Sequence, residues 1–472
     1  MATLQLSSSL GKNKVLKLTL PTSHCLHPLV PGSAMLQGHG GAGAAGDAIS
    51  PAHRSVFGHE TPEMRSCQTL PRLEEPTGTC QAVLSCSFSP KALRDVINIS
   101  WQCFSTGGHH PMQEGEVFNT QYQVLHKLGC GAFATVWLCQ DMRRQKQVAV
   151  KVLKSREGFA DTAQDEVAFL RCVNCMKKKD LAGENIVCLL DDFRMIGENG
   201  FHACLVFEVL GPSIRCLMGN YRAQELPLPF VKKSLQQVLA GLHFLHECCR
   251  IIHADIKPEN ILLCGHSKRL QRLLMATLDC DQGTEGKLKG AGGDLGNQLE
   301  ESDLMSIEVK IADLGSACWT YKPFSKEIQT QPYRALEVLL GLDYGTPADI
   351  WSTACLAFEM ATGECLFDPQ PGKYFSRDDD HVARIIELLG RIPPQIVFSW
   401  NKSTQFFSKP GALLRLSRLC PRSLPGILAD RHGWTPQEAA AFAAFLLPAL
   451  HYAPERRASA AQSLRHAWIA AP

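Results

Sequence analysis

Residues 251–260 read IIHADIKPEN, and this stretch decides what kind of protein the chain is. A carboxylate, a cation and an amide stand close together in it, at Asp255, Lys257 and Asn260. A carboxylate can accept a proton from a hydroxyl, an ammonium group can neutralise developing negative charge, and an amide oxygen can hold a divalent cation. The stretch therefore predicts a catalytic site, and the surrounding sequence decides of which class.

The segments around this stretch differ in texture. Residues 1–106 are rich in Gly, Ser and Pro and have no sustained period, which predicts an irregular or disordered tail. Short β-rich runs such as YQVLHKLG and QVAVKVLK follow and predict an antiparallel sheet over 107–211. FVKKSLQQVLAGLHFLHECC then has a helical period, which is lost over 265–306 and returns afterwards. We expect a β-rich lobe, then a helical lobe over 212–264 and 307–472, with 265–306 as a flexible spacer insert.

Further motifs stand before and after the opening stretch in a fixed order. They are LGCGAFATV at 128–136, VAVK ending at Lys151, Glu166 in AQDEVAFL, Asp313 in IADLGSA, Glu337 in ALE, Asp349 in DIW and Arg457 in PERRA. Each one alone has a structural explanation, such as a turn between strands, a capping aspartate or a surface ion pair. Their joint order and spacing predict the bilobal protein-kinase fold, which is an α+β fold with an antiparallel β N-lobe and a mostly helical C-lobe.

The kinase pattern assigns a role to each catalytic candidate. Lys151 would neutralise the nucleotide phosphates, with Glu166 holding that lysine in place. Asp255 would accept the hydroxyl proton, and Lys257 would neutralise charge on the transferred group. Asn260 and Asp313 would hold Mg²⁺, and they complete the predicted site.

Among protein kinases the chain resembles the SR-protein kinases, which phosphorylate serines in Arg/Ser-repeat domains of splicing factors. The resemblance runs from about Gly107 to the C-terminus, apart from the insert, and depends on TVWLC, LLDDF, VFEVLG, DIKPENILL, IADLGSACW, TPADIWSTAC and SRDDDH. It implies ATP and Mg²⁺ as cofactors and Arg/Ser-rich splicing factors as protein substrates. It also implies nucleotide-binding positions at Leu128, Gly129, Gly131, Val136, Ala149, Lys151, Glu208 and Leu210, and substrate-docking positions at Asp380, Glu387, Arg334 and Arg377.

Several letters depart from the usual kinase or family pattern. Ala254 stands where most kinases have the arginine that receives an activating phosphate, and the family also lacks that arginine. Leu314 replaces the usual phenylalanine after Asp313, which again resembles the family. Ala134 replaces a small residue of the glycine-rich loop, a change that backbone N–H groups can tolerate. TQPYR at 330–334 departs further, because Gln331 removes a cation and Pro332 deletes a backbone N–H near the acceptor.

The predicted docking helix, DHVARIIELLG, carries a departure of its own. Its apolar period places Asp380, Arg384 and Glu387 on one exposed face. By resemblance the two acids belong to a groove for arginine-rich substrate, where the family usually has an apolar residue at position 384. Arg384 could pair with both acids and neutralise the groove, or the face could be an ordinary solvated surface with internal ion pairs.

Composition adds little on partners. A formal net charge of +2 over 472 residues implies neither nucleic acid nor a membrane surface, and no apolar run reaches the length of a membrane span. The 20 cysteines are scattered, and the one CxxC, Cys172 to Cys175, predicts unpaired thiols rather than a metal site. We expect a monomer without direct nucleic-acid contact, distributed between cytoplasm and nucleus.

Three functions remain open from the sequence. The first is a working Ser/Thr kinase of Arg/Ser-rich proteins, which Lys151, Glu166, Asp255, Asn260 and Asp313 favour. The second is a weak or inactive pseudokinase that binds Arg/Ser-rich partners as a scaffold, which the TQPYR and Ala134 departures favour. The third is an active kinase with altered substrates, which the changed docking helix favours.

Overall fold

A computed structural model describes residues 4–6, 16–18 and 108–470, apart from 156–158, 198, 221–224, 266–298, 300, 324, 399–402, 409–410 and 417. Most of the expected tail and spacer therefore lies outside the described residues. Within the tail, β1 (Leu4–Leu6) pairs antiparallel with β2 (Leu16–Leu18). The last residues of the expected spacer form α7 (Glu301–Ser306), where Leu304 is buried.

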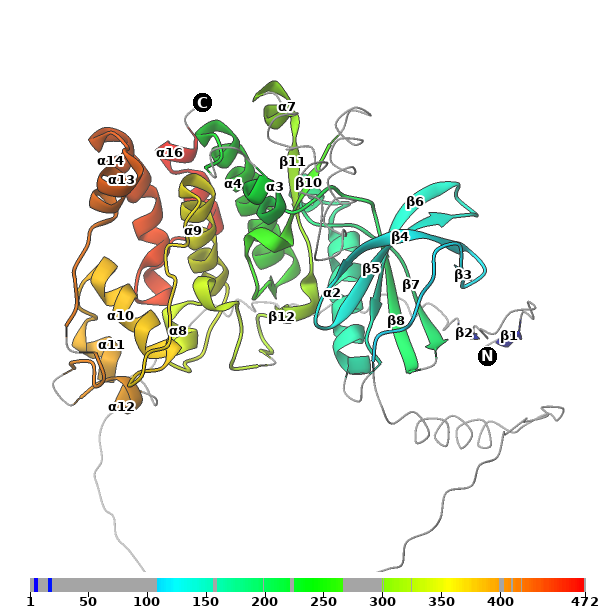
Figure 1. Cartoon of the computed structure of the whole chain (residues 1–472), viewed down its shortest axis with the longest axis horizontal. Helices are drawn as coiled ribbons and strands as arrows, with labels where there is room; N and C mark the ends of the chain where they lie inside the picture. The colour runs from blue at the N-terminus through cyan, green and yellow to red at the C-terminus, as the bar shows by residue number, and fades with distance from the viewer. Residues whose placement is uncertain are drawn as a thin grey trace, which may run out of the picture. The chain divides into compact units, whose positions relative to one another are not determined.

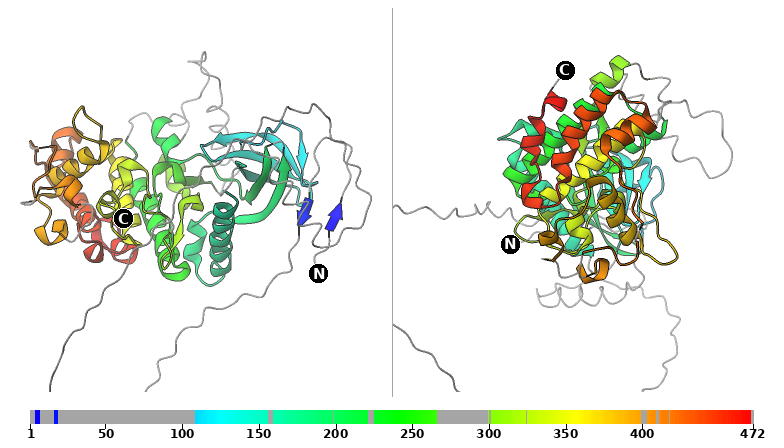
Figure 2. Two further views of the ribbon diagram at one scale, coloured as in Figure 1. Left: turned by 90° about the horizontal axis from the view of Figure 1, so that it is seen from below. Right: turned by 90° about the vertical axis from the view of Figure 1, so that its left-hand side faces the viewer.

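The N-lobe is a six-stranded antiparallel sheet in the order β3-β4-β5-β6-β8-β7. Its strands are β3 (Val117–Phe118), β4 (Tyr122–Cys130), β5 (Ala134–Asp141), β6 (Lys146–Leu153), β7 (Leu189–Gly197) and β8 (Gly200–Phe207). Helix α2 (Phe159–Met176) packs against β7 and β8, and the two views of Figure 2 show it beside the sheet. The short helix η1 (Leu181–Asn185) leads from α2 into β7.

The C-lobe is mostly helical and lies toward the left of Figure 1, with the N-lobe sheet at the right. Its first part contains α3 (Ile214–Asn220), α4 (Leu228–His243) with its π-helical extension η2 (Phe244–Cys249), β9 (Ile251–Ile252), η3 (Pro258–Asn260), β10 (Ile261–Cys264), β11 (Glu308–Ile311), η4 (Leu314–Ser316) and β12 (Cys318–Trp319). Its second part contains η5 (Gln331–Tyr333), α8 (Leu336–Leu339), α9 (Pro347–Thr362), α10 (Arg377–Leu389), α11 (Pro394–Phe398), α12 (Ser403–Phe406), α13 (Leu424–His432), α14 (Pro436–Leu446), η6 (Leu447–Leu450), η7 (Pro454–Arg456), α15 (Ala460–Leu464) and α16 (Ala467–Ala470).

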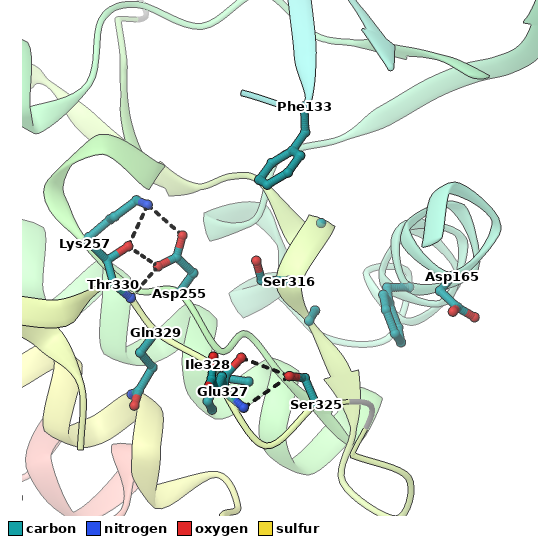
Figure 3. A pocket seen from close by; sticks show the side chains of 13 residues that line it. Phe133, Asp165, Asp255, Lys257, Ser316, Ser325, Glu327, Ile328, Gln329 and Thr330 are labelled. Carbon is teal, nitrogen blue, oxygen red and sulfur yellow. Dashed lines mark hydrogen bonds and ion pairs between the residues drawn. The ribbon is translucent and has the colours of Figure 1, made fainter. Parts of the chain in front are cut away.

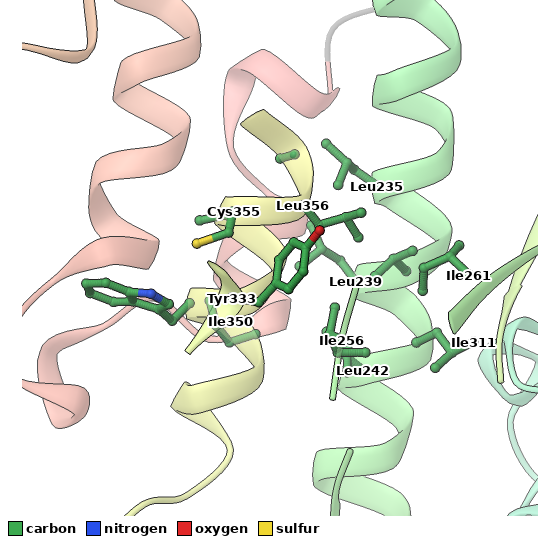
Figure 4. Packing of buried hydrophobic residues seen from close by; sticks show 14 of the residues in the cluster. Leu235, Leu239, Leu242, Ile256, Ile261, Ile311, Tyr333, Ile350, Cys355 and Leu356 are labelled. Atoms are coloured by element: carbon green, nitrogen blue, oxygen red, sulfur yellow. The ribbon is translucent and has the colours of Figure 1, made fainter. Parts of the chain in front are cut away.

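The C-lobe core forms between α4 and α9 (Figure 4). The apolar positions that repeat along α4, such as Leu235 and Leu242, are fully buried. Nearly every residue of α9 is buried, including Trp351, so this helix forms the centre of the lobe. The predicted start of α14 is confirmed, because Thr435 caps it in a capping box with Glu438. The fold is the predicted bilobal protein-kinase fold.

Candidate active site

Asp349, a buried aspartate of α9, holds the loop that carries Asp255. Asp349 has no exposed surface and accepts bonds from the backbone N–H groups of His253 and Ala254, both at 2.8 Å. His246 adds a third contact to Asp349, also at 2.8 Å. Ala254 has a φ of 64°, a conformation that side chains with a Cβ adopt rarely. The bonds to Asp349 hold this backbone in place, so the loop presents the next residue, Asp255, in one orientation.

The carboxylate of Asp255 is fixed by two neighbours (Figure 3). Lys257 Nζ lies 2.7 Å from Oδ2, and the Thr330 hydroxyl donates to Oδ1 at 2.7 Å. Thr330 also donates its backbone N–H to Oδ1 at 3.1 Å and accepts from Lys257 Nζ at 2.9 Å. Three groups thus form a closed triangle in which Asp255 is oriented and Lys257 is held beside it. Thr330 was not predicted as a site residue, although it opens the TQPYR segment.

Asp255 and Lys257 line a cavity of 590 Å³. Its other walls come from Phe133 at the tip of the glycine-rich loop, from α2, and from the segments 315–317 and 325–330. None of the predicted nucleotide-binding positions lines this cavity, whereas Asp255, the residue that an acceptor hydroxyl must approach, does. The cavity is therefore a candidate site for the acceptor chain rather than for a nucleotide base.

Lys151 on β6 joins the two lobes through two carboxylates. Its Nζ lies 2.7 Å from Glu166 Oε1 on α2 and 2.8 Å from Asp313 Oδ1. Burial would lower the pKa of Lys151, but the charges of Glu166 and Asp313 raise it above its ordinary value. The Lys151 charge in turn lowers the pKa of Asp313 to about 2. Burial raises the pKa of Glu166 against the pull of this lysine, yet the 2.7 Å contact with a protonated Lys151 is that of a charged pair.

Asn260 and Asp313 can supply oxygen ligands to a metal ion. Asn260 is 6% exposed and uses its amide nitrogen on Asp255, donating to the backbone oxygen at 2.8 Å and to Oδ2 at 3.2 Å. Its amide oxygen is the atom that could bind a cation, and Asp313 is ionised. Mg²⁺ prefers a few protein oxygens together with substrate phosphates, so these two residues fit it. Among the described residues, no cluster of three or more His, Cys, Asp or Glu side chains could hold a metal by itself.

The predicted nucleotide-binding residues lie along the β4–β5 turn and the strands next to it. Val136 is the register partner of Gly129 across β4 and β5, and of Lys151 across β5 and β6. A Cβ added at Gly129 would meet nothing within 4 Å, and one at Gly131 only the backbone oxygen of Ala134 at 3.8 Å. The space beside both glycines is thus open to a ligand.

Three other predicted nucleotide-binding residues lie in β4, in β6 and just after β8. Leu128 falls at a register shift in β4, Ala149 pairs with Phe207 across β6 and β8, and Leu210 is 8% exposed. Ala134 is also 8% exposed and belongs to the main hydrophobic core, so its methyl group is accommodated by packing.

Glu208 differs from the rest of the predicted nucleotide-binding set. Its carboxylate contacts Lys310 Nζ at 2.9 Å and accepts from the backbone N–H of Cys188 at 2.9 Å. The side chain therefore has protein partners, and the backbone N–H of Glu208 donates to Cys188 O at 3.4 Å.

The docking helix α10 begins in a capping box. The Ser376 hydroxyl accepts from Asp379 N–H, and Asp379 also bonds Arg415 Nη1 at 2.7 Å. Asp379 is 4% exposed, and its role was not predicted. The sequence signal for it was present in Ser376, which stands three residues before Asp379 at the start of an apolar-periodic stretch.

The expected exposed face of α10 is only half-exposed, and this part of the prediction was wrong. Arg384 Nε bonds Asp380 Oδ2 at 2.7 Å, and the Asp380 side chain is 16% exposed. Glu387 Oε1 instead accepts from the backbone N–H of Cys420 at 2.8 Å, and no ion pair within the described part of the chain joins it to Arg384. Arg384 therefore neutralises one of the two acids, because the chain around Cys420 folds over the other.

The TQPYR segment contacts the start of α10. Gln331 Nε2 donates to Asp378 Oδ1 at 2.8 Å, and Pro332 is in the first turn of η5. Arg334 donates to the backbone oxygens of Ile328 and Gln329. Arg377, at the first turn of α10, donates from Nε to Pro369 O at 3.0 Å.

A partly buried network behind this segment was not predicted. Arg215 of α3 contacts Glu259 Oε1 at 2.9 Å, Glu359 Oε1 at 2.6 Å and the Tyr333 hydroxyl at 2.7 Å. It joins the catalytic loop, η5 and α9, whose residues are up to 144 positions away in the chain. No local motif marks Arg215, so the sequence offered no signal for this role.

Two further findings concern the described residues as a whole. All 14 cysteines among them are free thiols, including Cys172 and Cys175 of the CxxC. No helix among them is both long and apolar enough to cross a bilayer.

Known proteins resemble this chain over the same region. The protein kinase domain family matches residues 122–469. Human SRSF protein kinase 3 is 35% identical to this chain over 78% of this chain and 89% of its own length. The serine/threonine-protein kinase SRPK of Physarum polycephalum is 38% identical over 78% of this chain and 90% of its own length, and protein kinase dsk1 of Schizosaccharomyces pombe is 32% identical over 77% and 83%. Together with the geometry of Lys151, Asp255 and Asp313, these matches show that the chain is a protein serine/threonine kinase and belongs to the SR-protein kinase family.

Proposed function

We propose that this chain transfers the γ-phosphoryl group of ATP, with Mg²⁺, to serines in Arg/Ser-rich domains of splicing factors. The observation that carries the proposal is the triangle of Asp255, Lys257 and Thr330, which lines the 590 Å³ cavity. It holds a base and a cation together where an acceptor hydroxyl would enter. The Arg/Ser-rich acceptor follows from the family and from the name of its human relative, an SRSF protein kinase.

The chemistry proposed for these side chains is positioning and charge neutralisation, with no covalent intermediate. Asp255 would accept the hydrogen bond of the serine hydroxyl and orient its oxygen. Lys257 would neutralise charge that develops on the transferred group. Lys151 would hold the nucleotide phosphates, and Mg²⁺ bound at Asn260 and Asp313 would neutralise the triphosphate.

A direct test is phosphate transfer from labelled Mg-ATP to an Arg/Ser-repeat peptide. We expect transfer by the wild-type chain, none by Asp255→Ala, and weaker transfer to a peptide in which lysine replaces every arginine. Nucleotide affinity of the Asp255→Ala chain, measured by titration calorimetry, is the control for a folded nucleotide site. Equal transfer by the wild-type and Asp255→Ala chains would refute the assignment of Asp255.

Two candidate functions remain beside this one, and each has an observation in its favour. A scaffold without turnover is favoured by Gln331 and Pro332, which change the acceptor side of the site. A kinase with altered substrates is favoured by the Arg384–Asp380 pair, which neutralises the charge of one acid on the docking helix. The transfer assay separates them, because a scaffold binds the peptide without phosphorylating it, whereas an altered kinase phosphorylates peptides with fewer arginines.

The proposal includes the cellular setting. We place the protein in both cytoplasm and nucleus, as a monomer that binds no nucleic acid or membrane directly. Fractionation of cells that express the tagged chain tests the localisation, and light scattering of the purified chain tests whether it is a monomer.

A further inference from the structure

The segment that links the two lobes carries an ion pair with a strand of the C-lobe. Glu208 directly follows β8, the last strand of the N-lobe, and its two carboxylate oxygens each lie 2.9 Å from Lys310 Nζ. Lys310 stands on β11, and 102 residues separate the two partners. The side chains are 26% and 12% exposed, so water screens this pair far less than a surface pair.

The same carboxylate also contacts the segment that enters β7. Glu208 Oε1 accepts from the backbone N–H of Cys188 at 2.9 Å, and the backbone N–H of Glu208 donates to Cys188 O at 3.4 Å. Just before Cys188, Val187 N–H donates to Ile311 O of β11 at 2.9 Å. One carboxylate thus joins the inter-lobe segment, the entry to β7 and β11.

β11 leads directly to the predicted metal ligand. Lys310 is three residues before Asp313, and Leu262 of β10 is its register partner. β10 begins directly after Asn260, whose backbone oxygen accepts from Ala312 N–H at 2.8 Å. Both metal-binding candidates therefore lie at one end of the β10–β11 pair that Lys310 attaches to the inter-lobe segment.

We propose that the Glu208–Lys310 pair is a positioning clamp that sets the distance between the inter-lobe segment, which receives the nucleotide base, and Asp313, which faces its phosphates. Glu208 and Lys310 act through the backbone of their segments and touch no reacting atom. The inference rests on the proposed function in one respect, which is that a nucleotide spans these two points.

Burial explains why a loss of one partner should matter. Removing the Lys310 ammonium leaves a largely buried carboxylate without its ion-pair partner, and such a group draws in water or shifts its segment to regain solvation. Either response displaces the inter-lobe segment relative to β11. Removing the charges of both partners leaves no such carboxylate, so the double change should harm less than the sum of the two single changes.

The test measures nucleotide affinity, and separately kcat and KM, in four variants of the ion pair and one control variant, all in the full chain. Lys310→Met, Glu208→Gln and the double variant break the clamp, and Lys310→Arg keeps its charge. Lys233→Met is the matched control, because Lys233 donates to a backbone oxygen of the C-lobe, Met305 O, at 2.6 Å and lies on α4. Calorimetric titration with Mg-ADP gives the affinity, and thermal unfolding gives stability.

We expect Lys310→Met to weaken Mg-ADP binding by about 3- to 20-fold and to raise the KM for ATP by a similar factor. The KM for peptide should stay unchanged, Lys310→Arg should restore most of the affinity, and Lys233→Met should bind as the wild type does. The clamp would be overturned if the Lys310→Met chain bound Mg-ADP as tightly as the Lys233→Met chain does. It would also be overturned if the only effect of Lys310→Met were a lower melting temperature. If Lys310→Met does not fold, Glu208→Gln decides in the same way.

The titration also separates the clamp from the proposed function. A wild-type chain that binds Mg-ADP but transfers no phosphate would refute the kinase proposal, while the affinity ratio of the variants still tests the clamp. A wild-type chain that binds no nucleotide at all would refute both.

Discussion

Replacing Arg384 with leucine should convert the docking helix to a stronger acceptor of arginine-rich peptide. Arg384 Nε lies 2.7 Å from Asp380 Oδ2, and the two side chains are 38% and 16% exposed. The pair has the i, i+4 spacing with the acid on the N-terminal side, which is worth about 0.3–0.5 kcal/mol on a partly exposed helix face. The fold should therefore tolerate its loss.

The gain in binding follows from the charge that is released. Asp380 of the Arg384→Leu chain can pair with an arginine of the peptide without first breaking an internal pair. A partly exposed pair of this kind contributes about 0.5–1 kcal/mol, which corresponds to about 2- to 5-fold tighter binding. The contribution is electrostatic and outside the deep core, so it should shrink as salt rises.

The assay is fluorescence anisotropy of a labelled Arg/Ser-repeat peptide at about 50 mM and about 500 mM salt, a range over which screening changes strongly. Arg431→Leu is the control, because it also removes one positive charge from the chain. Arg431 lies elsewhere on the surface, 3.9 Å from the exposed Glu364. Arg384→Leu should bind more tightly than Arg431→Leu at low salt, and the two should converge at high salt. Equal affinities at low salt would refute the reasoning that Arg384 competes with the substrate for Asp380.

Three further changes have defined outcomes. Arg457→Met should lower the free energy of unfolding by about 3–5 kcal/mol, because it leaves the buried Glu337 carboxylate unpaired. Chemical denaturation measures this loss, and the double variant that also carries Glu337→Leu should recover part of it. The hydrogen bond with Cys249 lowers the pKa of the Cys172 thiol, so alkylation of Cys172 should begin at a lower pH than that of an ordinary thiol. Mass spectrometry of the Cys249→Ala chain should find this rise at higher pH, and an unmoved rise would contradict the assignment. Tyr333→Phe removes the buried hydroxyl that bonds Arg215 and Glu359, so it should lower the free energy of unfolding by about 1–3 kcal/mol. In steady-state assays it should raise the KM for peptide more than the KM for ATP. An unchanged KM for peptide would show that this hydroxyl only stabilises the fold.

Local patterns were enough to predict the framework of the fold. The apolar period from Val231 to Leu242 predicted a buried helix, and the pattern around Thr435 predicted the start of another. The order of the motifs predicted that Lys151 and Glu166 meet, because a strand lysine and a helix glutamate 15 residues apart form a pair only in a particular fold. These features depend on neighbours in sequence or on one well-defined fold, so letters suffice for them.

Contacts between distant side chains could not be predicted in the same way. The left-handed backbone of Ala254 depends on Asp349, 95 residues further along the chain. Lys310 and Glu208 meet across 102 residues, and neither lies in a motif that indicates a partner. The exposure of Asp380 was misjudged for a related reason, because helical period predicts a face but not the chain that folds across it. The backbone N–H of Gln370, in the segment before α10, bonds Asp380 from outside the helix.

Two of the three departures from the family pattern, in the TQPYR segment and at Arg384, fall on the acceptor side of the site, and Thr330 marks the boundary. Its hydroxyl bonds Asp255, while the side chain of the next residue, Gln331, bonds Asp378 of α10. Within the described part of the chain, no hydrogen bond joins that segment to Lys151 and its two carboxylates, the groups that would hold the nucleotide phosphates. A change of arginine to glutamine at 331 therefore alters the surface that meets the acceptor chain and leaves the phosphate side intact. The sequence differences argue for a kinase whose choice of acceptor has changed, more than for one whose chemistry has been lost.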